Sequence, residues 1–305
     1  MSIPSGQQCR VFLLVLLTGL SSCEKEYIPP ETMVDTQLTV NCLFDNYSSF
    51  RLYLTRSSSI LAPMNIVSVA DARVYLYEED TFREVLVYVP SDTANTFGAY
   101  QSSFTPVFGK KYSIRVEHPH YGIVTANERM PVLIRMDSVR LVSKGDASQN
   151  QDGIVEIFFS DIAAEKNMYR LNTWLQMQRA VVNETTGDTV ISTTSDGRKA
   201  TPEEELSDFF QESSWSILFS DGTFNGRQMK LTLHFKAVRL SRYEEVNLYV
   251  DLLHISQAYY DYIKTLKQQR SSNEDDDFLP VYGNVKNGYG IFAGSAIHSA
   301  MIKLK

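Results

Sequence analysis

From residue 37 onward the sequence alternates strictly between apolar and polar residues. Leu38, Val40 and Cys42 are apolar and the residues between them are polar, the pattern of a strand that buries one face. The same period of two recurs near Leu52, Val74, Val85, Tyr112 and Val124, with turn residues between the runs. Several short antiparallel strands in this arrangement are typical of an immunoglobulin-like β-sandwich, which we place at residues 37–131.

The remaining residues, 132–305, alternate in longer runs. Residues 169–178, 229–236 and 246–252 each alternate between a mainly apolar set of side chains and a mainly polar set that includes Trp174 and Tyr249. These runs predict a second antiparallel β-rich domain. The fold class predicted for the whole chain is therefore mostly β, with one or two short helices.

The stronger helix prediction lies near residues 257–270. Ser256 is a suitable N-cap, and behind it an apolar stripe recurs at helical spacing on Tyr259, Tyr262, Ile263 and Leu266. A shorter helix is predicted at residues 202–212, because acidic residues at its start suit the positive end of a helix dipole.

The N-terminus predicts export. Arg10 precedes the apolar run VFLLVLLTGL, which is too short to cross a hydrocarbon layer of about 30 Å, so residues 1–22 are read as a cleaved signal peptide. The following L-S-S-C resembles a bacterial lipobox and predicts that Cys23 is lipidated. An ordinary secretory signal with an incidental Cys23 is the alternative. Residues 23–36 are charged and contain prolines, and we interpret them as a tether to the membrane.

Composition excludes some classes of partner. The formal net charge is −7 and no basic stripe is present, which argues against nucleic acid. After removal of residues 1–22 the cysteines are Cys23 and Cys42, so lipidation of the first leaves no pair for an internal disulfide.

No motif in the sequence predicts an enzyme, a cofactor or a metal site. The spacing of three glycines, Gly288, Gly290 and Gly294, resembles that of a phosphate-binding loop. Such a loop is followed by a helix, whereas the residues after these glycines predict a strand. We therefore interpret these glycines as structural. The pair His118 and His120 and the acidic run at 274–277 are read as loops, because neither has the ligand spacing of a metal site.

Aromatic residues are frequent, with 17 tyrosines, 16 phenylalanines and 2 tryptophans. Tyr75, Tyr77, Trp174 and Tyr249 fall on strand faces opposite the more aliphatic ones. Such residues form stacking platforms for sugars or anchors for a protein partner. The alternative is that they fill the core of a second sheet.

Six segments of the chain resemble, in order, a known family. They are ADARVYLYEED, GKKYSIRVEHPHYGIVTANERMP, VEIFFSDIAAEKNMYRLN, FSDGTFNGRQMKLTLHF, LHISQAYYDYIKTL and PVYGNVKNGYGIFAG. The chain is similar to domain-of-unknown-function family 4249, a group of lipoproteins of Bacteroidota. The most specific resemblance is the signature N-x-x-N-G-x-G-I-F-x-G, formed here by Asn284, Asn287, Gly288, Gly290 and Gly294.

The resemblance implies a lipid-anchored protein of the outer membrane, often associated with TonB-dependent transporters that take up glycans or peptides. It brings no known reaction. Glu24, Lys25 and Glu26 resemble a loose form of the signal that exports such lipoproteins to the cell surface, although a periplasm-facing orientation stays open. The function expected is an accessory or ligand-binding component of such an uptake complex. A cell-surface hydrolase with unidentified carboxylates and an envelope-structural lipoprotein are the alternatives.

Overall fold

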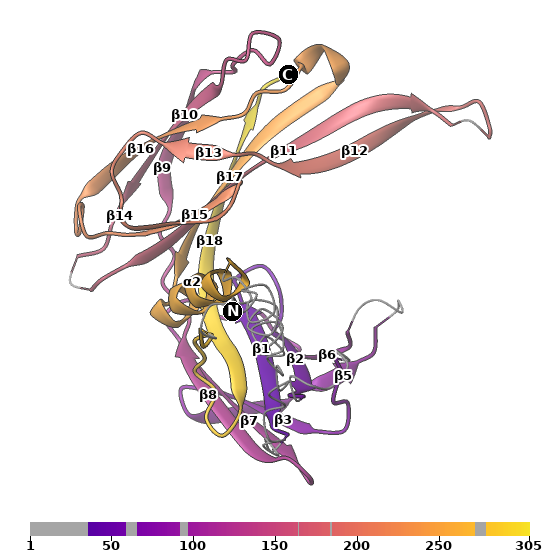
Figure 1. Cartoon of the computed structure of the whole chain (residues 1–305), viewed down its shortest axis with the longest axis vertical. Coiled ribbons are helices and arrows are strands. Elements are labelled where there is room, and N and C mark those ends of the chain that lie inside the picture. Colours follow the sequence, from indigo (N-terminus) through magenta and orange to yellow (C-terminus); the bar gives the residue numbers. More distant parts are fainter. Residues whose placement is uncertain (1–35, 59–65, 92–96, 164, 184, 272–278) are drawn as a thin grey trace, which may run out of the picture. The chain divides into compact units, whose positions relative to one another are not determined.

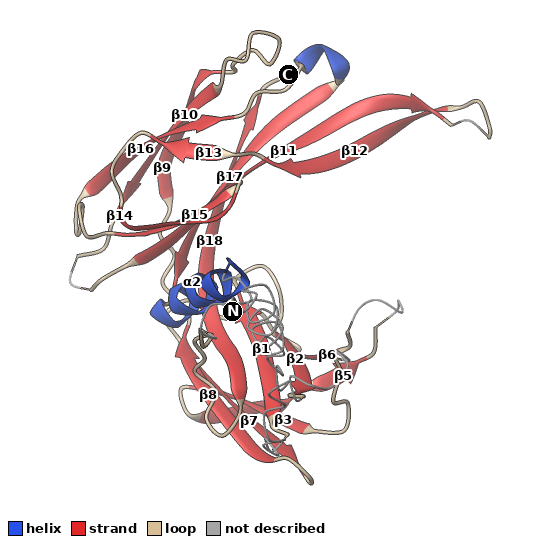
Figure 2. Cartoon of the chain, viewed as in Figure 1, coloured by secondary structure: helices blue, strands red, loops and turns tan. Residues whose placement is uncertain are grey.

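The computed structural model describes residues 36–58, 66–91, 97–163, 165–183, 185–271 and 279–305. Most of these residues lie in strands (Figures 1 and 2). Three sheets form, one with ten strands and two with four strands each. The mostly β fold class predicted from the alternation is confirmed.

The strands of the N-terminal part are β1 (Leu38–Phe44), β2 (Arg51–Arg56), β3 (Arg73–Glu78), β4 (Thr81–Val85), β5 (Val87–Val89), β6 (Ala99–Gln101), β7 (Lys111–His118) and β8 (Gly122–Arg129). They are followed by β9 (Met136–Ser143), β10 (Gly153–Ser160), β11 (Met168–Val182), β12 (Thr189–Gly197), β13 (Ala200–Pro202), β14 (Ser207–Ser213), β15 (Ser216–Ser220) and β16 (Gln228–Phe235). The chain continues with the 3₁₀ helix η2 (Leu240–Arg242), β17 (Glu245–Ile255), α2 (Gln257–Ser271) and β18 (Tyr289–Lys303).

The ten-stranded sheet has the order β14-β15-β11-β17-β18-β1-β2-β6-β5, and β12 pairs with β11 beside this path. Its strands are antiparallel except at one place, where β1 and β18 run parallel from Thr39 and Tyr289 to Phe44 and Gly294. Strand β18 therefore joins strands from the two ends of the chain.

One core lies between the β1, β2 and β18 part of this sheet and the four-stranded sheet β4-β3-β7-β8. The alternation places Leu38, Val40 and Phe44 in it, and Phe292 joins them from β18. A second core lies between the β15, β11 and β17 part and the four-stranded sheet β13-β16-β10-β9. Ala300 and Ile302 of β18 pack against this second core, so the same strand contributes to both.

Helix α2 begins after Ser256, whose hydroxyl accepts a hydrogen bond from the backbone N–H of Tyr259 at 3.2 Å. Tyr259, Tyr260 and Ile263 are buried in a third cluster against β18 and the strands beside it. The described helix thus begins at the predicted N-cap.

The second, shorter helix predicted at residues 202–212 is wrong. This segment forms β13, a short connection and β14, which pairs with β15. Asp208 has a φ of 51°, which no right-handed helix contains, and Leu206 is buried in the second core. Pairing and burial against β15 outweigh the weak local helix preference of the acidic residues.

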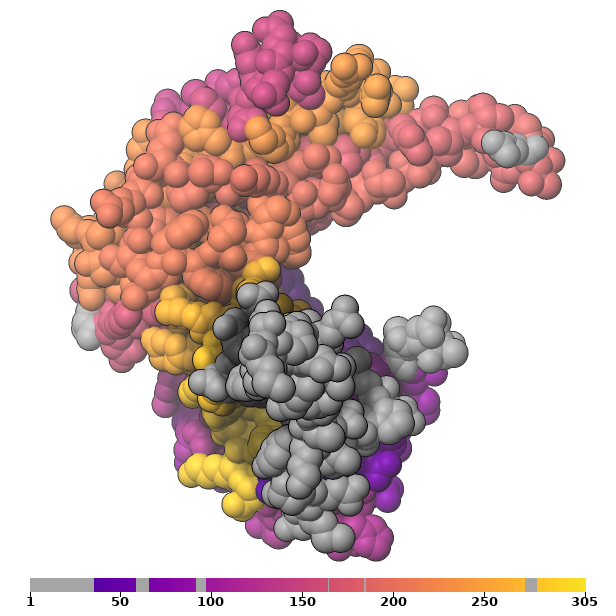
Figure 3. Space-filling view, in the orientation of Figure 1, coloured from indigo at the N-terminus to yellow at the C-terminus, as the bar shows by residue number. Residues whose placement is uncertain are grey.

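Strands β11 and β12 extend as a two-stranded hairpin beyond the rest of their sheet (Figure 3). The pairing of β11 with β17 ends at Gln178, whereas its pairing with β12 continues to Val182. Val182 and Ile191 near the end of the hairpin are 64% and 58% exposed.

Candidate functional site

Two of the predicted platform residues, Trp174 and Tyr249, lie directly opposite each other on β11 and β17. Their rings stack with centroids 4.0 Å apart and an angle of 5° between the planes. The indole Nε1–H donates a hydrogen bond of 2.9 Å to Oδ2 of Asp251. The neighbours of Trp174 along β11, Thr173 and Leu175, are buried on the opposite face, so the stack lies on the face turned away from the second core.

A third aromatic residue, Trp215, joins this face. Gly197 of β12 is the register partner of Trp174, so its missing side chain would lie on the same face as the indole. A Cβ atom built there would come within 2.4 Å of Trp215 Cγ. Only glycine at this position lets Trp215 lie against the strand beside Trp174. The next partner in the row is Met301 of β18, opposite Tyr249 and 55% exposed.

We call Trp215, Trp174, Tyr249 and Met301 the aromatic row. Register places a polar row on each side of it. One consists of Ser216, Asn172, Asp251 and Ser299, and the other of Ser195, Gln176, Asn247 and Lys303. The resulting face is aromatic along its middle and rich in hydroxyl and amide groups along its borders.

Two amide oxygens in these polar rows have no hydrogen-bond partner among the described residues. They are Oδ1 of Asn172 and Oδ1 of Asn247, and both are buried. The other end of the Asn247 amide is engaged, because Nδ2 donates to Glu245 Oε1 at 2.8 Å. Buried acceptors without donors are uncommon in folded proteins and are costly to keep, which marks this face as unusual.

The other two platform residues, Tyr75 and Tyr77, lie on β3 in a different sheet. Both approach Phe82 of β4, with ring centroids at 6.5 and 5.9 Å. The four aromatic residues therefore do not form one platform.

The sequence analysis did not identify Trp215 as a candidate, because no alternating run precedes it. The available signal was that the chain contains only two tryptophans.

The signature residues lie where β1 and β18 run parallel. The Asn284 side chain hydrogen-bonds to both backbone groups of Phe292. It donates to the carbonyl at 2.8 Å and accepts from the N–H at 2.9 Å. Asn287 adopts a left-handed backbone with φ of 60°. Each of these residues fixes the path of the chain into β18.

The signature glycines fill places without room for a side chain. At Gly290, φ is 102° and a Cβ would lie 1.9 Å from the Val40 carbonyl oxygen. A Cβ on Gly288 would lie 2.6 Å from the Leu38 carbonyl oxygen, and one on Gly294 would lie 2.7 Å from the Phe44 ring. Close approach of β1, rather than an anion, accounts for the spacing of these glycines.

A separate cavity of about 470 Å³ lies between the end of β8, the β10–β11 loop and the start of α2. Glu128, Glu165 and His254 are among its lining residues. Burial raises the pKa of the Glu128 carboxyl, against hydrogen bonds from the Arg129 N–H and the Ser256 hydroxyl.

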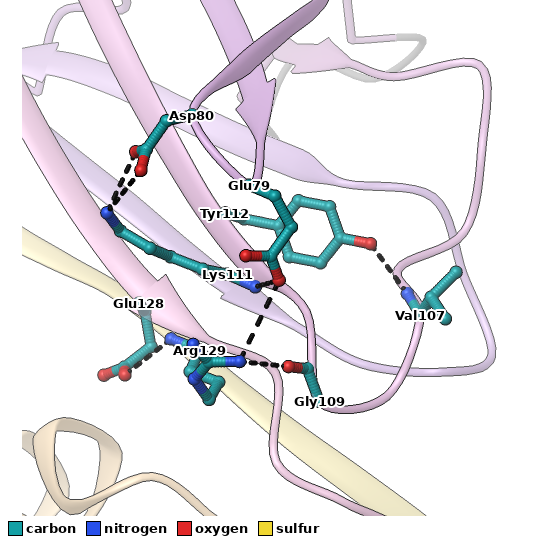
Figure 4. A network of polar contacts seen from close by, with 8 residues as sticks. All are labelled: Glu79, Asp80, Val107, Gly109, Lys111, Tyr112, Glu128 and Arg129. Atoms are coloured by element: carbon teal, nitrogen blue, oxygen red, sulfur yellow. Dashed lines mark hydrogen bonds and ion pairs between the residues drawn. The ribbon is translucent and has the colours of Figure 1, made fainter.

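Figure 4 shows a network of polar contacts that includes three lining residues of this cavity, Gly109, Glu128 and Arg129. The Arg129 guanidinium donates to the Gly109 carbonyl, and the Arg129 N–H donates to Glu128 Oε1 at 2.8 Å. Glu79 accepts from the backbone N–H of Lys111 at 3.0 Å. The Arg129 N–H thus holds one carboxylate oxygen of Glu128 at the end of β8.

His254 contributes one ring nitrogen to the scaffold. Its Nδ1 lies 2.9 Å from the Val132 carbonyl oxygen, which fixes that nitrogen as the protonated one in the neutral ring. Burial lowers the pKa of the imidazole, against the Val132 hydrogen bond and the carboxylates of Asp161, Asp221 and Glu165. The ring is therefore held neutral.

His118, read from the sequence as part of a solvated loop, is buried instead. Its Nδ1 accepts from the N–H groups of His120 and Tyr121, and its Nε2 lies 3.1 Å from Asp71. Among the described residues no group of His, Cys, Asp and Glu has the arrangement of a metal site. The acidic run at 274–277 lies outside these residues, as do Cys23, Glu24, Lys25 and Glu26.

The fold and the aromatic row define a β-sheet protein with an open aromatic and polar face. The sequence matches the family described as Domain of unknown function (DUF4249) over residues 24–300, and the chain belongs to this family. A comparison with curated proteins finds no match. In the described part of the chain, no helix is long and apolar enough to cross a membrane.

Proposed function

We propose that this protein is a surface-exposed outer-membrane lipoprotein that binds a ligand as an accessory component of a TonB-dependent nutrient-uptake complex, with a glycan or a peptide as cargo. The lipobox at Cys23, the acidic tether and the resemblance to Bacteroidota lipoproteins support the location. The observation that carries ligand binding is the stacked Trp174 and Tyr249 pair, whose indole is held by Asp251 on an open sheet face.

The anchoring is tested with Cys23→Ala. One acyl chain holds a protein only marginally, and lipoproteins with several chains stay membrane-bound, so the variant is expected to leave the outer-membrane fraction. Retention of Cys23→Ala in washed outer membranes contradicts the lipid anchor. Protease treatment of intact cells then distinguishes a surface orientation from a periplasmic one.

The uptake role is tested by purifying the tagged protein from native outer membranes in mild detergent. Stoichiometric recovery of a TonB-dependent transporter is the expected result. Recovery of the lipoprotein alone contradicts the accessory role and favours a free-standing binder or an envelope-structural protein.

A hydrolase is the second candidate, because Glu128 and Glu165 line one cavity and burial raises the pKa of Glu128. Burial favours the protonated form of a carboxyl, which is the form required of a general acid. Turnover of a glycan or peptide substrate that is abolished by Glu128→Gln supports this function. Turnover that is unchanged in both Glu128→Gln and Glu165→Gln contradicts a hydrolase function of this cavity.

A further inference from the structure

We propose that the aromatic row binds an uncharged oligosaccharide, with a sugar ring stacked on Trp174 beside Trp215. This inference rests on the proposed ligand-binding function and names the ligand class and the site.

The stacking surface is prepared by the neighbours of Trp174. Tyr249 covers the indole from the side of β17, which leaves the other ring face on the side of β12. There the register partner is Gly197, which has no side chain, and Trp215 lies over it with 37% of its surface exposed. An apolar sugar face finds two indoles at this position, one on β11 and one in the turn between β14 and β15.

The two polar rows supply the hydrogen bonds. Sugar hydroxyl groups are donors, and the rows hold acceptors that lack them: Oδ1 of Asn172 and Oδ1 of Asn247. Asn247 is 5% exposed, and its cross-strand neighbours Gln176 and Lys303 have long side chains that can turn aside when a ligand binds. A ligand hydroxyl that donates to such an acceptor removes the free-energy cost of leaving it unpaired. The hydrogen bond absent from the free protein then contributes to binding.

Charge favours a neutral ligand. The two polar rows contain one acidic residue, Asp251, and one basic residue, Lys303, at opposite borders of the face. Asp251 is already engaged by the Trp174 indole. Recognition of an acidic sugar or a phosphate requires clustered basic groups, which these rows do not contain.

The position of the strands favours a sugar over a peptide. An extended peptide gains most of its affinity on a sheet by pairing with a free strand edge. Next to Trp174 and Tyr249 both strands are paired on each side: β11 with β12 and β17, and β17 with β11 and β18. Among the described residues β12 and the second half of β18 each pair on one side only, so the strand edges lie one strand away and a ligand over Trp174 and Tyr249 meets side chains.

The chain has an internal reporter for this site, because its two tryptophans are Trp174 and Trp215. The full chain carrying Cys23→Ala is screened on an array of neutral and acidic oligosaccharides, and hits are titrated by tryptophan fluorescence. A neutral oligosaccharide is expected to change the emission and to lose affinity by about tenfold or more in Trp174→Ala. Tyr75→Ala, on the other sheet, is the matched control and is expected to bind normally.

Asn247→Leu separates binding from folding. It removes an acceptor that has no partner among the described residues, together with one hydrogen bond from Nδ2 to Glu245, so the thermal midpoint is expected to change little while affinity falls. Three results overturn the inference: no neutral oligosaccharide binds, binding is unchanged in both Trp174→Ala and Asn247→Leu, or acidic sugars bind better than neutral ones.

Failure of this inference and failure of the uptake role are distinguishable. Sugar binding at Trp174 without a copurifying transporter supports the proposed sugar site and contradicts the role in an uptake complex. Copurification of a transporter without sugar binding supports the role in an uptake complex and contradicts the proposed sugar site.

Discussion

The two halves of β18 belong to one strand but have different surroundings. Residues 289–294 lie against β1, and Ile291, Phe292 and Ala293 are all buried. Residues 295–303 pair with β17, and Met301 and Lys303 are exposed on the face that carries Trp174. The first half is constrained by contact on both faces, so its sequence is fixed by packing. The second half has one free face, where side chains are available for a ligand.

The largest difference is expected from Gly290→Ala in the first half. The new Cβ would meet the Val40 carbonyl oxygen at 1.9 Å, at a φ of 102°. We expect the free energy of unfolding to fall by about 4 kcal/mol or more, measured by urea denaturation. Gly187→Ala is the control, because its φ is 76° with nothing within 4 Å, and it should cost only about 1 kcal/mol. Equal losses in the two variants would show that conformation, not contact with β1, decides the cost.

Asn284→Ala tests the same half without changing a glycine. It removes both hydrogen bonds to the backbone of Phe292, a fully buried residue. Thermal and urea denaturation should report a loss of about 2 kcal/mol, the cost of leaving buried backbone groups unpaired. Asn127→Ala, an exposed position on β8, should change the stability by less than about 0.5 kcal/mol. A fall in the free energy of unfolding as small for Asn284→Ala as for Asn127→Ala contradicts a stabilising role of the two hydrogen bonds to Phe292.

The second half and its neighbours are compared by double-mutant cycles. The pair Trp174 and Tyr249 should couple by about 1 kcal/mol, because the rings are parallel and close. The pair Tyr77 and Phe82, at 5.9 Å and edge-on, should couple by about 0.5 kcal/mol. The stability of each single and double variant supplies both values. A Trp174 coupling near zero would remove the evidence that this stack is rigid before a ligand binds.

The smallest effect is expected at the junction of the halves, where the Ser256 N–H donates to the Gly294 carbonyl at 3.1 Å. Ser256 also bonds Glu128, whose carboxyl pKa is raised by burial above the 4.5 of a free group. The folded protein holds this proton more tightly than the unfolded chain. Its contribution to stability is therefore full below pH 4.5 and is lost as the pH rises through the raised folded pKa.

Glu128→Gln should consequently raise the thermal midpoint at about pH 7 and change it little at about pH 4. Glu165→Gln, a second acidic residue of the same cavity that is exposed, is the matched control and should leave the pH profile unchanged. A pH profile of Glu128→Gln identical to that of the unaltered protein would contradict the raised pKa of this carboxyl.

Local periodicity by itself determined much of this protein. Alternation identified β1, β11, β16 and β17 and the parity that turns Trp174 and Tyr249 away from the core, because side chains on a strand alternate whatever the strand pairs with. The N-cap and apolar stripe likewise determined α2. The residues that follow the last glycines predicted a strand in place of the helix of a phosphate loop, and β18 has that position.

Tertiary structure decided which strands are neighbours. No local pattern specifies that β18 runs parallel to β1, that Tyr75 lies on another sheet than Trp174, or that Trp215 covers Gly197, because these pairings join residues far apart in sequence. The same reason explains the wrong helix at 202–212, where pairing with β15 overrides a weak local preference. Sequence determined which way each side chain faces, and long-range register decided what it meets there.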